Sequence, residues 1–275
     1  NILNKYVDNF VIVESTYNHK GEKRELKFNP KKFGNFKDKI IYLIYDEIPS
    51  EVESISDNEL ENEKSGKLIM NALHRESGQR NFIINGLKNA NSEDIILISD
   101  VDEIPNLENI IFDKIKKKII FFNQDMLYYK FNLKLPNLTW TGTRGCKKKY
   151  LKSPQWIRNI KDRKYPFYRL DALFSEKKFI SCEIIKNGGW HFTNIKTAIE
   201  IQHKLRSYLH HIEFDKNPLT IDKINEIIKN KKAIYDLTAD KREDKFEGNK
   251  LENYPLEKLP KFLIDNLNNY KQWMD

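Results

Sequence analysis

Short apolar runs alternate along the chain with longer segments in which apolar residues recur at helical spacing. The runs FVIVES (10–15), KIIYLIY (39–45) and DIILIS (94–99) are rich in β-branched residues and predict strands. A helix is expected from about 67 to 90, and the run IIFFNQDMLYYKFNL (119–133) predicts a long strand or a hairpin. Strands that alternate with helices favour an α/β fold with a mostly parallel sheet.

The segments between and after these runs complete the expected organisation. A polar, basic segment (16–33) follows the first strand and is typical of a long functional loop. A helix is expected after Pro105, over NLENIIFDKIKK (106–117). From residue 197 onward, amphipathic stretches predict a helical C-terminal part (197–275) within a single domain (1–275).

Length and composition narrow the class of protein. A chain of 275 residues can bury a full core, and its 16 Phe, 13 Tyr and 4 Trp exclude a disordered protein. The formal charge of +8 suggests an anionic ligand such as nucleic acid, a nucleotide or phosphate. Two cysteines, Cys146 and Cys182, predict reduced thiols. No stretch reaches the length of a membrane span, so we expect a cytoplasmic protein, with a lost N-terminal anchor as the alternative.

Three carboxylates, Asp100, Asp102 and Glu103, crowd the end of the third predicted strand. They repel one another, and each costs free energy if it loses water without gaining a partner, so positive charge is expected beside them. On an extended backbone Asp100 and Asp102 would share one side, and Val101 would point into the core. Two such carboxylates suit Mg²⁺ or Mn²⁺, ions whose coordination shell is usually completed by substrate phosphates. As an alternative, Glu103 would cap the helix expected after it.

A second group of candidate residues lies in NGGWHF (187–192). Its paired glycines permit a close backbone approach or a positive φ. His191, flanked by aromatic residues, would ligate Mn²⁺ readily, or would be a core residue whose polar atoms are satisfied.

Basic and aromatic residues form a third group, between the hairpin and this run. The basic ones would neutralise a diphosphate or lie on a solvated face. They are Arg144, Lys147, Lys148, Lys149, Arg158, Arg163 and Arg169. Four aromatic residues would stack on sugar rings or belong to the core: Tyr128, Tyr129, Trp140 and Trp156.

Several motifs, in order along nearly the whole chain, resemble glycosyltransferase family 17. This is the family of the bisecting β-1,4-N-acetylglucosaminyltransferase and its bacterial and viral relatives. The motifs are VDNFVIVEST, HRESGQRNFI, DIILISDVDEIP, WTGTRG, NGGWHF and KLRSYLHH. The resemblance implies a GT-A (Rossmann-like) fold, a nucleotide-sugar donor, a divalent metal and inversion at the anomeric carbon. The family default is N-acetylglucosamine from a UDP donor, transferred to a glycan or another acceptor hydroxyl.

The resemblance also suggests roles for individual residues. Asp100 and Asp102 match the metal motif, and His191 matches the family's Gly-Trp-His. Family members place residues near the nucleotide at the positions of Glu14, Arg80 and Asn81. The charge pattern adds Arg144 and Arg169 as candidates for charge-assisted bonds to the diphosphate.

Two departures from the family pattern change what is expected. Family members begin with a strand that carries a Phe-Phe-Asn-Glu-type stretch, and the chain is expected to lack it. The Ser-Phe-Ala-His-x-Glu pattern appears at 207–213 with its acid, Glu213, displaced by one residue. Inversion needs a general base, and we rank Asp125 first, then Glu213, then Asp171.

Two other classes of function stay open at this level. A nucleic-acid-binding module would place its basic residues in a stripe with interleaved aromatics and would not use the acidic strand end. A metal-dependent phosphoryl-transfer enzyme or nuclease would use the same carboxylates. That chemistry normally needs a second acidic cluster for a second ion, and the sequence offers none that convinces.

Overall fold

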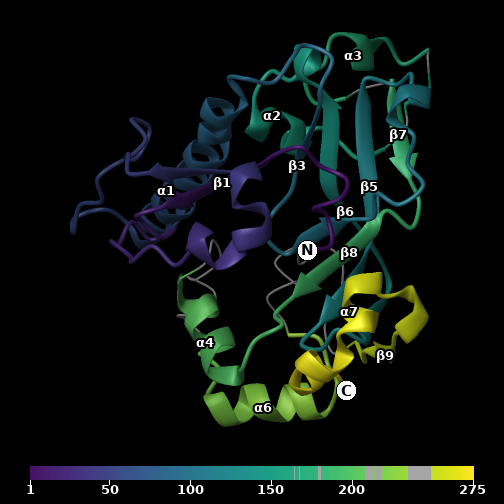
Figure 1. Ribbon diagram of the computed structural model, residues 1–275. Helices are drawn as coiled ribbons and strands as arrows, with labels where there is room; N and C mark the ends of the chain where they lie inside the picture. Colours follow the sequence, from purple (N-terminus) through teal and green to yellow (C-terminus); the bar gives the residue numbers. More distant parts are fainter. Residues whose placement is uncertain (164, 167, 179–180, 208–213, 215–217, 235–248) are drawn as a thin grey trace.

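The computed structural model describes residues 1–163, 165–166, 168–178, 181–207, 214, 218–234 and 249–275. Its strands form two sheets with helices packed around them (Figure 1). The smaller sheet pairs β1 (Phe10–Ser15) in parallel with β2 (Ile40–Tyr45). Both strands lie where the apolar runs predict them.

The larger sheet has the strand order β3-β6-β5-β8-β4, with β7 paired to β5 and β9 paired to β6. Its strands are β3 (Ile95–Ile98), β4 (Glu103–Pro105), β5 (Ile119–Tyr128), β6 (Leu133–Lys147), β7 (Cys182–Ile185), β8 (Gly189–Thr193) and β9 (Glu252–Asn253). The α/β class is therefore confirmed, and the run 119–133 is the first half of a hairpin formed by β5 and β6.

The expectation of a mostly parallel sheet is wrong. β5 pairs in parallel with β7 and β8, whereas β6 runs antiparallel to both β3 and β5, and β4 runs antiparallel to β8. The physical reason is the short connection between β5 and β6, since a hairpin can only join antiparallel strands. Because β6 lies between β3 and β5, this hairpin makes the whole sheet mixed.

The helices agree with the sequence in part. α1 (Glu61–Asn81) begins earlier than expected and continues as the 3-10 helix η2 (Phe82–Leu87), and α2 (Pro154–Asn159) packs against α1. The C-terminal part contains α4 (Ala198–Ser207), α6 (Ile221–Lys229) and α7 (Lys261–Asp265) (Figure 1). The other helices are η1 (Pro30–Lys39), η3 (Phe112–Lys114), η4 (Lys148–Tyr150), α3 (Leu170–Leu173), η6 (Leu256–Lys258) and η7 (Leu267–Trp273). Among the described residues, no helix combines the length and the apolarity of a membrane span.

The helix expected over 106–117 is wrong, because this segment contains only η3. Asn109 adopts a φ of 66°, which lies outside the right-handed helical region. The apolar residues of the segment still reach the core, since Leu107 is buried against Ile120 and Phe122 of β5. Ile110, Phe112 and Ile115 pack partly against the same cluster, whereas Ile111 is exposed.

The core is organised on the two faces of β5. Ile119 and Phe121 point to one face and pack with β3 and the helix layer, while Ile120 and Phe122 point to the other face. Farther along the strand, Met126 packs with residues of α4 and α6. β5 therefore joins the helices at both ends of the molecule to one sheet.

The paired glycines before β8 allow a close approach, as expected. Gly189 has a φ of 129°, and a Cβ there would lie 2.1 Å from the carbonyl oxygen of Ile104. Gly189 pairs with Pro105 of β4, so this contact brings β4 against β8.

We predict opposite effects for alanine at two glycines. Gly189→Ala should lower the free energy of unfolding by at least about 2 kcal/mol, because its φ and the overlap with Ile104 both strain a side chain. Gly66→Ala, inside α1 with nothing near the added Cβ, should raise it by about 0.5–1 kcal/mol. Urea unfolding measures both variants, and equal stability of the two would contradict the assigned contact.

Candidate functional site

The acidic segment between β3 and β4 is a turn. The backbone N–H of Glu103 donates to the carbonyl of Asp100 at 3.1 Å, which places Val101 and Asp102 at the tip. Val101 is fully exposed, so the expectation that it points into the core is wrong. Strand alternation does not apply here, because the extended backbone ends at Ile98.

Glu103 is the buried member of this turn, with a side chain that is 0% exposed. Its carboxylate accepts hydrogen bonds from Trp140 Nε1 at 2.8 Å and from the backbone N–H of Asp100 at 3.0 Å. Arg158 donates to both carboxylate oxygens, at 2.8 and 2.9 Å. The alternative of a helix cap is wrong for Glu103, because it begins β4 and its partners come from β6 and α2.

Asp100 is held by two arginines. Its Oδ1 accepts from Arg80 at 3.0 Å, and its Oδ2 accepts from Arg158 at 2.9 Å. Arg80 also bonds to Glu76 at 2.6 Å and to Gln155. The positive charge expected beside the crowded carboxylates is thus present, and it comes from α1 and α2.

Asp102 faces His191 instead. Asp102 Oδ1 lies 3.4 Å from His191 Nε2, and the backbone N–H of Phe192 donates to the carbonyl of Asp102 at 2.8 Å. Burial raises the pKa of Asp102, but the hydrogen bond and charge of His191, with the charge of Lys204, lower it below its ordinary value. The other ring nitrogen of His191 is buried and has no hydrogen-bond partner among the described residues.

Open space adjoins Asp102. A cavity of about 500 Å³ is lined by Asp102 and Val101 together with apolar side chains, among them Phe10 of β1 and Phe192 of β8. Asp102 is the acidic side chain among the described residues that line it. The turn therefore directs one carboxylate at this cavity and keeps the other two in ion pairs with arginine.

The comparison with protein families decides what kind of protein carries this turn. The profile of glycosyltransferase family 17 matches residues 1–274. The chain belongs to glycosyltransferase family 17. No significant match is found among curated proteins or among solved structures. A sugar donor and a sugar acceptor follow from the membership.

Two expected nucleotide-site residues of this family 17 transferase hold α2. The side chain of Asn81 accepts from the backbone N–H of Gln155 at 2.9 Å, beside the N-cap residue Ser153. At the other end of α2, Arg144 donates to the carbonyls of Arg158 and of Ile160, the latter at 2.5 Å. Burial and the charge of Arg158 lower the pKa of Arg144 to about 10. Both residues therefore position the helix that carries Arg158.

Glu14 organises the basic loop (16–33). It accepts from the backbone N–H groups of Lys27 and Phe28 at 2.8 and 3.0 Å, and from the hydroxyl of Tyr42 at 2.8 Å. Burial alone would raise the pKa of Glu14, but these hydrogen bonds lower it below its ordinary value. The loop is thus tied to the end of β1 by one carboxylate.

The three base candidates lie away from the Asp102–His191 pair or outside the described residues. Asp125 bonds to Lys134 at 2.5 Å and to the hydroxyl of Tyr254 at 2.8 Å. It pairs in register with Trp190, so it points to the opposite face of the sheet from His191. Glu213 lies outside the described residues.

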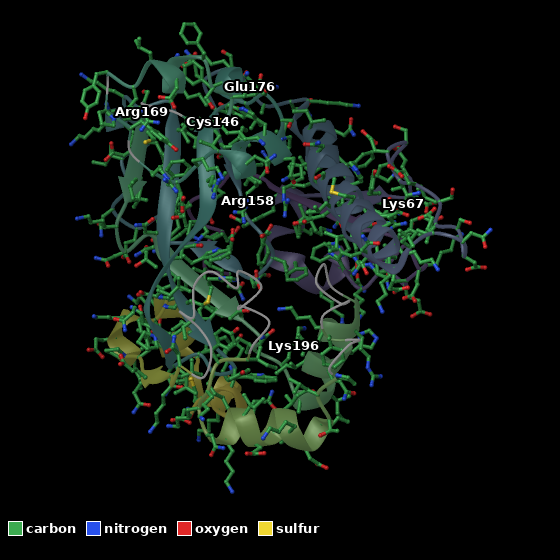
Figure 2. The ribbon with its side chains drawn as sticks, turned by 180° about the vertical axis from the view of Figure 1, so that it is seen from behind. Lys67, Cys146, Arg158, Arg169, Glu176 and Lys196 are labelled. Atoms are coloured by element: carbon green, nitrogen blue, oxygen red, sulfur yellow. The ribbon has the colours of Figure 1, made fainter. Side chains whose placement is uncertain are left out.

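The candidate base Asp171 and the candidate phosphate ligand Arg169 form one exposed cluster. Arg169 donates to both oxygens of Asp171, at 2.7 and 2.9 Å, and Lys178 donates to the same carboxylate. Figure 2 shows Arg169 well separated from Arg158. The structure therefore does not bring this pair to the acidic turn.

The remaining basic and aromatic candidates divide between surface and core. Lys147 and Lys149 pair with Glu93 at 2.8 and 2.5 Å, Lys148 bonds to the carbonyl of Ala90, and Arg163 is exposed.

Among the aromatic candidates, Tyr128 and Tyr129 are buried core residues. Trp140 contributes to the site by its bond to Glu103 and by its ring, 5.1 Å from that of His191. Trp156 packs against the core, partly buried, and its indole N–H donates to the carbonyl of Glu176.

Residue-type patterns missed two members of the site, Glu76 and Gln155. Both bond to Arg80, and the backbone N–H of Gln155, in the first turn of α2, donates to Asn81. Neither has a sequence signal of its own beyond its place near Arg80 or in a short helix.

The buried pair of Glu103 and Arg158 leads to a prediction about stability. Glu103→Gln should lower the free energy of unfolding by about 3 kcal/mol, because it removes the buried counter-charge of Arg158 and leaves the guanidinium paired with the more exposed Asp100 alone. The double variant Glu103→Leu/Arg158→Met should lose less than the sum of the single variants. Glu93→Gln, which breaks exposed pairs, is the matched control and should change stability by at most about 1 kcal/mol. Urea unfolding in which Glu103→Gln matches this control would contradict the assignment.

Glu14 leads to a prediction about pH. Because its pKa in the folded state is below the ordinary value of 4.5, it stabilises the fold above that pH, and the contribution is lost as the pH falls through the folded pKa. Glu14→Gln should be less stable than the wild type by about 1–3 kcal/mol at neutral pH, and the difference should narrow in acid. Thermal unfolding from neutral to acidic pH measures it, with the exposed Glu25→Gln as control. A constant difference would show that the charge of Glu14 is not responsible.

Proposed function

We propose that this protein is a metal-dependent, inverting transferase of the GT-A type that moves N-acetylglucosamine from a UDP donor to a hydroxyl of a glycan or another acceptor. The observation that carries the proposal is that two neighbouring carboxylates in a family 17 chain have different surroundings. Asp100 is neutralised by Arg80 and Arg158, whereas Asp102 faces His191 beside an open cavity. One charged carboxylate is thus kept available for a ligand.

The residues present fit a divalent ion. Mg²⁺ and Mn²⁺ are commonly bound by one or two protein groups, with substrate phosphates and water at the remaining positions. Asp102 and His191 supply an oxygen and a nitrogen 3.4 Å apart, and the described residues contain no larger cluster of metal-binding side chains. Both oxygens of Asp100 accept from arginine, so Asp100 would join the shell only by giving up such a bond. When bound, the ion acts as a Lewis acid on the leaving diphosphate.

The reaction would then be a single displacement, in which a carboxylate of the chain acts as the general base. The acceptor hydroxyl gives its proton to a carboxylate, and its oxygen bonds to the anomeric carbon. The bond from that carbon to the diphosphate breaks, and the electron pair stays on the diphosphate oxygen. Asp125, Glu213 and Asp171 remain the candidate bases. For Asp125 the acceptor would have to approach the face of the sheet that carries Tyr254.

We also propose that the reaction takes place in the cytoplasm. Cys146 and Cys182 are both buried, and neither forms a disulfide. Reduced thiols are typical of that compartment.

Substitution of Asp102 tests the proposed function. Asp102→Asn keeps the volume and removes the charge, so transfer should fall by about 100-fold or more while the melting temperature stays near that of the wild type. Asp100→Asn should have a smaller effect on transfer. A panel of nucleotide sugars with and without Mn²⁺ should first identify the donor by its thermal stabilisation of the protein.

The control for this experiment is Asp113→Asn, which removes an exposed carboxylate of η3. It should transfer sugar as the wild type does. Full activity of Asp102→Asn in EDTA would contradict the metal-dependent reaction. His191→Ala should weaken the dependence on Mn²⁺ more than it lowers the melting temperature.

A further inference from the structure

The ammonium of Lys204 belongs to the surroundings of Asp102. Lys204 is a half-buried residue of α4, and its Nζ donates to the side-chain oxygen of Asn194 at 2.8 Å. Ile201 and Leu205, on the same helix, are buried in the core, so the helix that carries Lys204 is held in place. Asn194 directly follows β8, the strand that carries His191, and the backbone N–H of Phe192 in that strand donates to the carbonyl of Asp102 at 2.8 Å.

Asn194 accepts the hydrogen bond from Lys204 and so joins α4 to the end of β8. It directly follows β8, is 3% exposed and has a φ of 54°. Its amide nitrogen is buried without a hydrogen-bond partner among the described residues. A buried, unpaired donor and a left-handed backbone each cost free energy, and such costs concentrate at functional sites. Asn194, three residues beyond His191, thus fixes the position of the Lys204 ammonium.

The arginines near the acidic turn are engaged with the protein itself. Arg80 and Arg158 bond to Asp100, and Arg158 also bonds to Glu103. Arg144 donates to backbone carbonyls at the end of α2. A leaving diphosphate needs positive charge beside Asp102, and lysine is a common phosphate ligand because it acts as a compact charge with three donors.

We propose that Lys204, positioned by Asn194, binds the diphosphate of the donor beside the Asp102–His191 pair. The inference rests on the proposed function and deepens it. It assigns a phosphate-binding role to Lys204, the first residue of the motif KLRSYLHH.

A comparison of UDP with UMP tests this role, because the two differ by one phosphate. Calorimetric titrations at constant Mn²⁺ would use the wild type, Lys204→Gln and Lys204→Arg. Lys204→Gln should bind UDP about 10- to 100-fold more weakly and should bind UMP with nearly the wild-type affinity. Lys204→Arg keeps the charge and should recover part of the preference for UDP.

The matched control is Lys196→Gln. Lys196 is an exposed lysine two residues from Asn194, on the connection between β8 and α4 (Figure 2). This variant should bind both nucleotides as the wild type does. Asn194→Asp adds a carboxylate that pairs with Lys204, so it should weaken UDP binding while Lys204 itself is retained.

Each other outcome contradicts a different statement. Wild-type affinity of Lys204→Gln for UDP would overturn the inference and leave the proposed function standing. An equal loss of UDP and UMP affinity, with a lower melting temperature, would assign Lys204 a structural role and overturn it as well. A wild-type protein that binds neither UDP nor any other nucleoside diphosphate would overturn the proposed function itself.

Discussion

The arrangement of the site depends on the buried bond between Glu103 and Arg158. The Glu103 carboxylate is removed from water and receives hydrogen bonds from α2, from β6 and from the turn that it closes. Burial of a charge is costly unless every lone pair finds a donor, and here four N–H groups supply the donors. The geometry of this one carboxylate therefore sets the positions of the acidic turn, α2 and Trp140 relative to one another.

The same bond explains how three carboxylates share so little space. Arg158 is long enough to contact Glu103 and Asp100 at once, and Arg80 takes the second oxygen of Asp100. Two of the three negative charges are thereby compensated from one side of the turn. Asp102, at the tip, faces His191 from the other side. The crowded acidic motif thus has two carboxylates paired with arginine and one, Asp102, beside the cavity.

Much of this fold could be predicted from the sequence where local pattern and final structure coincide. The runs that became β1, β2, β3 and β5 are continuous, apolar and β-branched, so local preference and burial favour the same conformation. The segment 106–117 has the spacing of a helix, but its apolar residues reach the core on irregular backbone, which periodicity does not detect. Alternation of strands and helices alone predicts a parallel sheet, and the β5–β6 hairpin makes the sheet mixed instead.

The residues of the site could be predicted by type but not by partner. The pattern predicts Asp100, Asp102 and His191 as candidates. Which carboxylate is neutralised depends on α2, a helix of six residues held by contacts from distant segments.

The bonding of arginine and lysine side chains illustrates why residue type could be predicted more readily than partner. A planar guanidinium forms several directed bonds at once, so arginine is suited to buried architecture, and Arg144 and Arg158 are used in this way. An ammonium is a compact charge on a flexible stem, which suits a ligand that arrives and leaves. In this chain Arg144 and Arg158 hold the elements around the acidic turn, and their positions in the sequence do not reveal those partners.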